Sequence, residues 1–265
     1  MGDRHKSPRS IVVSMFTFDE YGDAIGAAWT VMRDHANRVG PDAPVPTCPG
    51  WTVRDLIAHQ GTVHRWVAAN IRGFNLDTKA VEAEGMTVRD QLEWLDLGAR
   101  DLLQALVDAP HEMEGEFFLL DAPPARLAWA RRQCHETSIH AYDAMSASNG
   151  SAPPAASTWI KPALGADGVD ELLTGFLPRP STKLRMPTPT SVLVETTDTN
   201  QAWTMEIGPD SIVTTRGAGN APDATWRGTA VGLYLALWNR GDEIEATGVD
   251  VLGPWREQFR IVWSR

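Results

Sequence analysis

The stretch Trp129-Ala-Arg-Arg-Gln-Cys-His-Glu-Thr-Ser-Ile-His-Ala-Tyr-Asp143 lies in a predicted helix over residues 125–147 and contains three candidate metal ligands. Each helical residue advances about 100° around the axis. His135 and His140 therefore point roughly 140° apart, too far to bind one metal ion from a single helix face. Glu136 and His140 are four residues apart and share a face, so this pair is predicted to bind a metal. The extra residue also disfavours a zinc protease, whose HExxH motif is one residue shorter.

A third ligand is expected from another helix, because metal sites in helical bundles are built from side chains on facing helices. The candidates are His59, His64 and His35. His59 is preferred because it lies on the apolar face of the predicted helix over residues 52–73, whereas His64 lies off that face.

The predicted metal-binding set is therefore His59, Glu136 and His140. Such a set suits zinc in a catalytic site, where positions stay open for water or substrate. Nickel, manganese and iron would also fit, and geometry would decide among them. The structural alternative is that the histidines are ordinary core residues and that Glu136 pairs with Arg132 one helical turn earlier.

The other reactive side chains near the motif are expected to play lesser roles. Cys134 is predicted to be a buried structural thiol that points away from the metal, and Cys48 a packing residue in a proline-rich turn. Arg131, Arg132 and Asp143 are predicted to face solvent or to lie next to the ligands. None of them is identified as a catalytic acid or base.

The first half of the chain predicts an antiparallel bundle of four helices. Apolar side chains recur every three to four residues in each segment. Capping boxes predict that the second helix starts at Thr52, with Asp55, and the third at Thr87, with Asp90. The predicted helices cover residues 18–38, 52–73, 87–109 and 125–147, and a linker follows over residues 148–157.

The second half predicts a smaller domain that mixes helices with short strands, so the fold class is α+β. Turn residues separate β-branched runs, as in a meander. Strands are predicted over residues 191–196, 202–207, 211–215, 224–228 and 243–247, and helices over residues 164–177, 229–238 and 255–262. The predicted domains are residues 15–150 and 158–265.

The composition limits the partners of this chain. It has 265 residues, a formal net charge of −10 and a pI of about 5.1. An acidic surface argues against nucleic acid and anionic membranes, because binding there depends on Lys and Arg. Two cysteines are too few for a disulfide framework, and Ile11-Val12-Val13 is too short for a signal peptide. We expect a cytoplasmic protein, either a monomer or a homodimer.

Two motifs resemble those of the mycothiol-dependent maleylpyruvate isomerase family, within the DinB-like metalloenzyme superfamily. They are residues 45–59, Val-Pro-Thr-Cys-Pro-Gly-Trp-Thr-Val-Arg-Asp-Leu-Ile-Ala-His, and the stretch at residues 129–143. Residues 228–240 and 247–250 resemble the family's C-terminal domain, which is similar to a sterol-carrier fold. The resemblance implies a DinB-like four-helix bundle in which His59, Glu136 and His140 bind the metal, usually zinc.

The resemblance also implies mycothiol as cosubstrate, and hence an actinobacterial source, which fits the excess of Arg over Lys. The reactive group would be a thiolate or water on the metal, since a divalent cation favours the deprotonated thiol. We expect a metal-dependent S-transferase that adds or exchanges this thiol on an electrophilic small molecule. The alternatives are a maleylpyruvate-type cis-trans isomerase and a non-catalytic small-molecule or metal-responsive binding protein.

Overall fold

The computed structural model describes residues 16–113 and 117–259 of the protein. The chain separates into two compact units. Among the described residues, the first, the helical unit, contains residues 16–113, 117–118 and 122–158, and the second, the sheet unit, contains residues 119–121 and 159–259.

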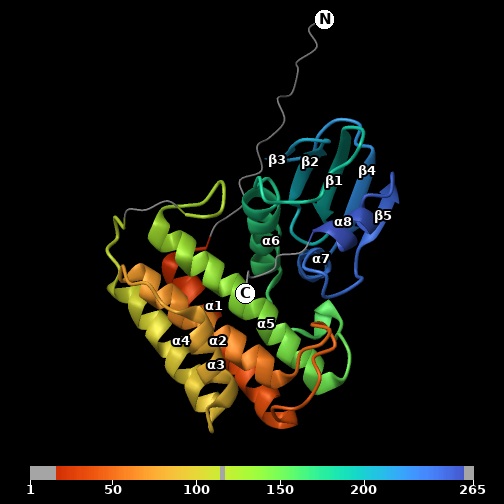
Figure 1. The fold of residues 1–265 in the computed structure, drawn as a ribbon. Coiled ribbons are helices and arrows are strands. Elements are labelled where there is room, and N and C mark those ends of the chain that lie inside the picture. The colour runs from red at the N-terminus through yellow and green to blue at the C-terminus, as the bar shows by residue number, and fades with distance from the viewer. Residues whose placement is uncertain (1–15, 114–116, 260–265) are drawn as a thin grey trace, which may run out of the picture. The chain divides into compact units, whose positions relative to one another are not determined.

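The helical unit is built on four long helices and one short one (Figure 1). Helix α1 packs on α5, and α2 contacts α3, α4 and α5. The apolar stripe of each long helix faces these neighbours; Ile25 and Met32 on α1, for example, are fully buried. The helices are α1 (Phe18–Val39), α2 (Val53–Ile71), α3 (Thr78–Thr87), α4 (Gln91–Asp108) and α5 (Ala125–Asn149), followed by the 3-10 turn η1 (Ala155–Ser157).

The start of α2 agrees with the predicted capping box, since Thr52 Oγ1 accepts the Asp55 amide and the Asp55 carboxylate accepts the Thr52 amide. The predicted start of the next long helix at Thr87 is wrong. Thr87 is the last residue of α3, and α4 begins after Asp90, whose carboxylate caps the Glu93 amide. Two helices therefore occupy the region where one was predicted.

The sheet unit contains a five-stranded sheet in the order β3-β2-β1-β4-β5. β1 pairs antiparallel with β2 and parallel with β4, and the outer pairs are antiparallel. Helices α6 and α7 pack on each other beside the sheet (Figure 1). The elements are α6 (Pro162–Asp170), the π-helix η2 (Glu171–Phe176), β1 (Thr190–Thr196), β2 (Ala202–Ile207), β3 (Ile212–Arg216), β4 (Ala224–Gly228), α7 (Ala230–Leu237), β5 (Glu245–Gly248) and α8 (Leu252–Gln258).

An ion pair between a buried carboxylate and a half-buried guanidinium joins the helical and strand parts of the sheet unit. Asp170, which is fully buried, accepts two hydrogen bonds from the Arg216 guanidinium at 2.6 and 2.7 Å and one from Trp203 Nε1 at 2.8 Å. These bonds attach the end of α6 to β2 and β3. Charged pairs of this bidentate kind also fix the orientation of the groups they join.

The structure confirms the α+β class, with mixed helices and a five-stranded sheet. The DinB-like type of the bundle and the sterol-carrier likeness of the second domain stay predictions. Within residues 16–113 and 117–259, none of the helices combines the length and apolar character needed to cross a membrane.

Candidate metal centre

The three side chains singled out in the sequence converge between α2 and α5. Glu136 Oε1 lies 3.5 Å from His59 Nε2 and 3.4 Å from His140 Nε2. Within the described residues, these ligand atoms form one of two groups in which all candidate donors lie within 4.8 Å of one another. All three side chains are buried, with 7–9% of each residue exposed.

The geometry of this triad fits a divalent metal ion. Donor atoms that bind zinc tetrahedrally through bonds of about 2.1 Å are about 3.4 Å apart, which matches the observed spacings. Glu136 Oε1 is also buried and forms no hydrogen bond with the described residues. A buried carboxylate oxygen without a hydrogen bond is costly, and a cation at this point would compensate for it.

Glu136 is held ionised by its surroundings. Its second oxygen, Oε2, accepts a hydrogen bond from Arg132 at 3.0 Å. Burial raises the pKa of Glu136, but the imidazoles of His140 and His59 and the Arg132 guanidinium outweigh it, so the pKa lies well below its ordinary value. The sequence analysis offered pairing with Arg132 as an alternative to a place in the triad. Glu136 does both, because Oε2 faces Arg132 and Oε1 faces the two histidines.

Asp143 fixes the orientation of His140. Its Oδ2 atom lies 2.9 Å from His140 Nδ1, and the residue is fully buried. With Nδ1 donating to this carboxylate, the Nε2 lone pair faces Glu136 and the open centre of the triad, as in carboxylate–histidine–metal arrangements. Burial lowers the pKa of His140, but Asp143 and Glu136 outweigh it and the pKa is raised.

The proline-rich connector before α2 supplies further contacts to this carboxylate. Thr47 Oγ1 donates to Asp143 Oδ1 at 2.6 Å, and Cys48 Sγ lies 3.2 Å from Asp143 Oδ2. A β-bridge between Pro44 and Thr52 closes the connector into a compact loop. Cys48, predicted as a packing residue, therefore touches the residue that orients His140, and it belongs to the second candidate donor group, with His140 and Asp143.

Trp51 forms a wall of the triad. Its ring centroid lies 5.1 Å from that of His59 and 6.2 Å from that of His140, with the latter pair stacked at 16°. The indole thus limits access of water to both imidazoles. Helical spacing could not predict this role, because Trp51 lies in an irregular connector. The contact of Asp143 with His140 could have been predicted from their three-residue spacing.

Within residues 16–113 and 117–259, the other histidines do not belong to either donor group. His64 is fully buried, and its Nε2 atom contacts Gln60 Nε2 at 2.8 Å and Thr137 Oγ1 at 3.1 Å. Burial lowers the pKa of His64 to about 3, with a smaller contribution from Arg65. His35 lies on α1, and His135 is buried in α5.

Arg131 and Arg132 are both 3% exposed, so neither faces solvent. Arg132 takes the other predicted position, next to a ligand, because it donates to Glu136. Cys134 is fully buried, as predicted, and is not joined to Cys48 by a disulfide.

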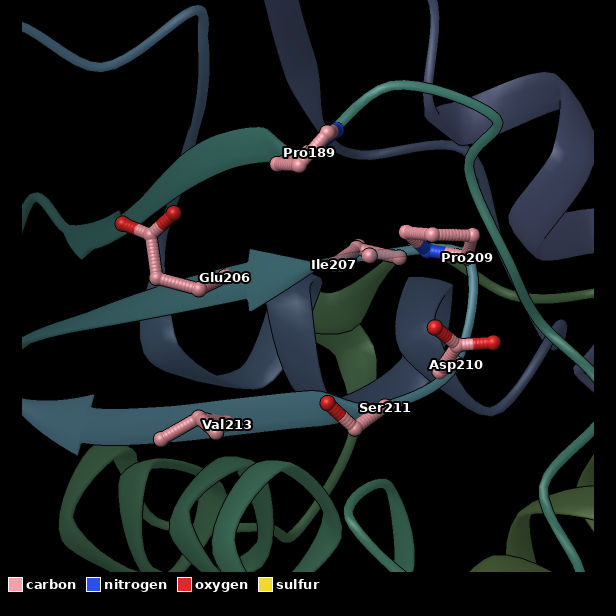
Figure 2. A pocket seen from close by; sticks show the side chains of 8 residues that line it. Pro189, Glu206, Ile207, Pro209, Asp210, Ser211 and Val213 are labelled. Atoms are coloured by element: carbon pink, nitrogen blue, oxygen red, sulfur yellow. The ribbon is translucent and has the colours of Figure 1, made fainter.

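A pocket of about 270 Å³ lies in the sheet unit, at the turn between β2 and β3 (Figure 2). Its walls include Glu206, Ile207, Pro209 and Asp210, and the two carboxylates stand apart. It contains no histidine or cysteine. This pocket therefore lacks the converging imidazole and carboxylate donors of the triad.

Comparisons with known proteins agree on the relationship of this chain. Residues 25–145 match the family model of the mycothiol maleylpyruvate isomerase N-terminal domain, and residues 163–256 match that of the MDMPI C-terminal domain. No curated protein sequence matches the chain.

Two solved structures share the fold. A crystal structure of mycothiol-dependent maleylpyruvate isomerase aligns with a TM-score of 0.61 and 13% identity, covering 88% of this chain and 93% of that one. A variant of that enzyme with one histidine replaced by alanine aligns with a TM-score of 0.60 and 12% identity, and the alignment also covers 88% of this chain and 93% of that one. At such identities the likeness shows the fold alone, but the two family models together span most of the sequence. The chain belongs to the mycothiol-dependent maleylpyruvate isomerase family.

Proposed function

We propose that this protein is a metal-dependent enzyme that uses mycothiol as cosubstrate and adds or exchanges the thiol on an electrophilic small molecule. The observation that carries the proposal is the convergence of His59, Glu136 and His140 at ligand spacing in a chain of this family. We further propose zinc as the resident ion, since two imidazoles and one carboxylate leave a fourth position for a reactant.

The protein residues prepare the centre for this chemistry. A divalent cation held by the triad would supply the charge that stabilises a thiolate over its thiol. Asp143 holds the His140 ring in the tautomer that presents Nε2, and Arg132 keeps Glu136 ionised and fixed. Trp51 covers both imidazoles on one side. The buried surroundings strengthen the electrostatic interactions within the centre.

The second candidate function is cis-trans isomerisation of a maleylpyruvate-type substrate, and family membership favours it. The two reactions share their first step, in which the thiolate adds to an electrophilic carbon. In an isomerase the sulfur leaves again after rotation about the carbon–carbon bond. In a transferase the carbon–sulfur bond persists and any leaving group departs.

The test is turnover by the purified protein with mycothiol and each of two electrophiles. Maleylpyruvate reports isomerisation and 1-bromobutane reports thiol transfer. We expect activity with at least one of them, loss on chelation, recovery on adding zinc, and no activity in His59→Ala. Glutathione in place of mycothiol tests the identity of the thiol.

A wild-type protein that binds metal but turns over neither electrophile with any thiol would contradict the enzymatic proposal. The non-catalytic alternative, a small-molecule or metal-responsive binding protein, would then be favoured. Activity that is unchanged by chelation and by His59→Ala would instead contradict the metal dependence.

A further inference from the structure

An aromatic cluster combines one tryptophan from each of the two helices that carry the triad with two phenylalanines from the segment before α5. The Trp129 ring on α5 has its centroid 5.6 Å from that of Trp66 on α2, 4.9 Å from Phe117 and 6.1 Å from Phe118. Phe117 and Phe118 are themselves 4.8 Å apart. All four side chains belong to the helical unit. We refer to Trp66, Phe117, Phe118 and Trp129 as the aromatic cluster.

The helical register aligns this cluster with the triad. Trp66 follows His59 by seven residues on α2, and Trp129 precedes Glu136 by seven residues on α5. Seven residues are close to two turns, so each tryptophan shares the helix face of the corresponding ligand, about 10 Å along the axis. The helices run antiparallel, because His59 meets Glu136 and Trp66 meets Trp129. The cluster therefore continues the row of side chains that forms the triad.

The aromatic cluster keeps part of its apolar surface accessible. Trp66, Trp129 and Phe117 are half-buried, and Phe118 is 42% exposed. By contrast, Trp94 on α4 is only 4% exposed. Small-molecule sites are lined mainly by apolar and aromatic side chains beside a few polar groups. The cluster and the triad together have that composition.

We propose that the aromatic cluster is a binding subsite for a flat apolar group, such as an aromatic ring, on the electrophile. This inference rests on the proposed thiol reaction and adds the class of its second substrate. The rings of the cluster would contact the ligand ring in offset-stacked or edge-to-face arrangements. The reacting carbon would lie at the triad, up to about 10 Å away.

A phenylalkyl halide such as 6-phenylhexyl bromide has the required shape, because its reacting carbon lies at the far end of a six-carbon chain attached to the ring. The thiolate sulfur forms a bond to the terminal carbon of this chain while the carbon–bromine bond breaks. Bromide leaves with the bonding electrons, and the thiol proton goes to solvent. The alkyl halide 1-bromobutane undergoes the same displacement, and it has no ring.

Binding of 4-nitrotoluene, which has the ring and no leaving group, tests the subsite without metal or thiol. Isothermal titration calorimetry would compare the full-length wild type with Trp129→Leu, Trp66→Leu and the control Trp29→Leu. Trp29 is also half-buried but lies on α1, where it donates to Asp96. We expect affinity to fall about fivefold or more in the two cluster variants and to stay unchanged in the control.

Turnover supplies the second measurement. We expect Trp129→Leu to lower kcat/KM for 6-phenylhexyl bromide at least as much as it weakens binding, and to leave kcat/KM for 1-bromobutane unaffected. Trp129→Phe, which keeps a ring, should retain most of the affinity, and Trp66→Leu carries the test if Trp129→Leu does not fold.

Two outcomes would overturn the subsite. One is the absence of saturable 4-nitrotoluene binding to wild type, and the other is equal affinity in the Trp129→Leu, Trp66→Leu and Trp29→Leu variants and wild type. An active wild type with either outcome would leave the proposed function standing. Conversely, loss of binding in the cluster variants alone would support the subsite even if metal or thiol dependence failed.

Discussion

Two buried polar clusters on the interface of α2 and α5 each contain histidine, yet their chemistry differs. His140 contacts the carboxylates of Asp143 and Glu136, and its pKa is raised. Among the described residues, the hydrogen-bond partners of His64 are Gln60 and Thr137, and burial lowers its pKa to about 3. Burial alone therefore does not distinguish a candidate ligand from a core histidine, whereas converging carboxylates do.

The same difference appears in what each cluster could bind. The triad presents two imidazole nitrogens and a carboxylate oxygen to one point. The cluster around His64 presents an amide and a hydroxyl, which are neutral and bind divalent transition metals weakly. We interpret the first cluster as functional and the second as structural, and the predictions below test that division.

The largest expected effect concerns the pH dependence of stability. The pKa of His64 is about 3 in the folded chain, below its ordinary value of 6.5. Below pH 6.5 the unfolded chain therefore binds the proton first, and the free energy of unfolding falls as the pH decreases toward 3. We expect a loss of roughly 2–3 kcal/mol from this residue by about pH 4.5. Urea unfolding with chelator present measures it.

The variant His64→Gln isolates this contribution, because a glutamine side chain does not titrate. Its free energy of unfolding should fall less steeply between about pH 7 and 4.5 than that of wild type. Parallel pH profiles for the two proteins would show that His64 is not held neutral by burial.

The next largest effect concerns metal affinity. Asp143→Asn removes the charge that orients His140, and we expect a metal affinity about 10- to 100-fold lower. Competition with a chromogenic chelator measures this affinity. Asp96→Asn is the matched control, since Asp96 is a buried carboxylate paired with Arg33 on other helices. Equal losses in the two variants would indicate a general effect on the fold.

The smallest expected effect is on the structural cluster. Thr137→Val preserves the shape of the side chain and removes the hydroxyl that contacts His64 and Gln60. We expect a loss of about 1 kcal/mol in the free energy of unfolding, measured by urea titration, with metal affinity unchanged. A drop in metal affinity as large as that of Asp143→Asn would show that the two clusters are not separate.

Much of the fold could be predicted from apolar periodicity and turn residues. Helices α1, α2, α5 and α7 and all five strands lie within a few residues of their predicted ranges. The missed helix α3 is short and mostly exposed, and Gly85 is its only buried residue among those described. Such a helix has almost no apolar stripe, so periodicity cannot reveal it.

The candidate site was predictable where helical spacing sets the geometry. The four-residue spacing of Glu136 and His140 and the face of His59 led to the triad that the structure brings together. Thr47 and Trp51 were not predictable, because their positions depend on the path of an irregular connector. For Arg131 and Arg132 the sequence left two positions open, in solvent or next to the ligands, since charged side chains usually face water. The contact with Glu136 selects the second position for Arg132.

The proposed function depends on the binding of one divalent metal ion by the triad, and metal content measures this binding. Inductively coupled plasma mass spectrometry would be applied to purified wild type, His59→Ala, His140→Ala and the control His64→Gln, after reconstitution with zinc. We expect about one metal ion per chain in wild type and in His64→Gln, and its loss in both triad variants. A folded wild type that takes up no metal, or triad variants that keep it, would show that the triad is not a metal site.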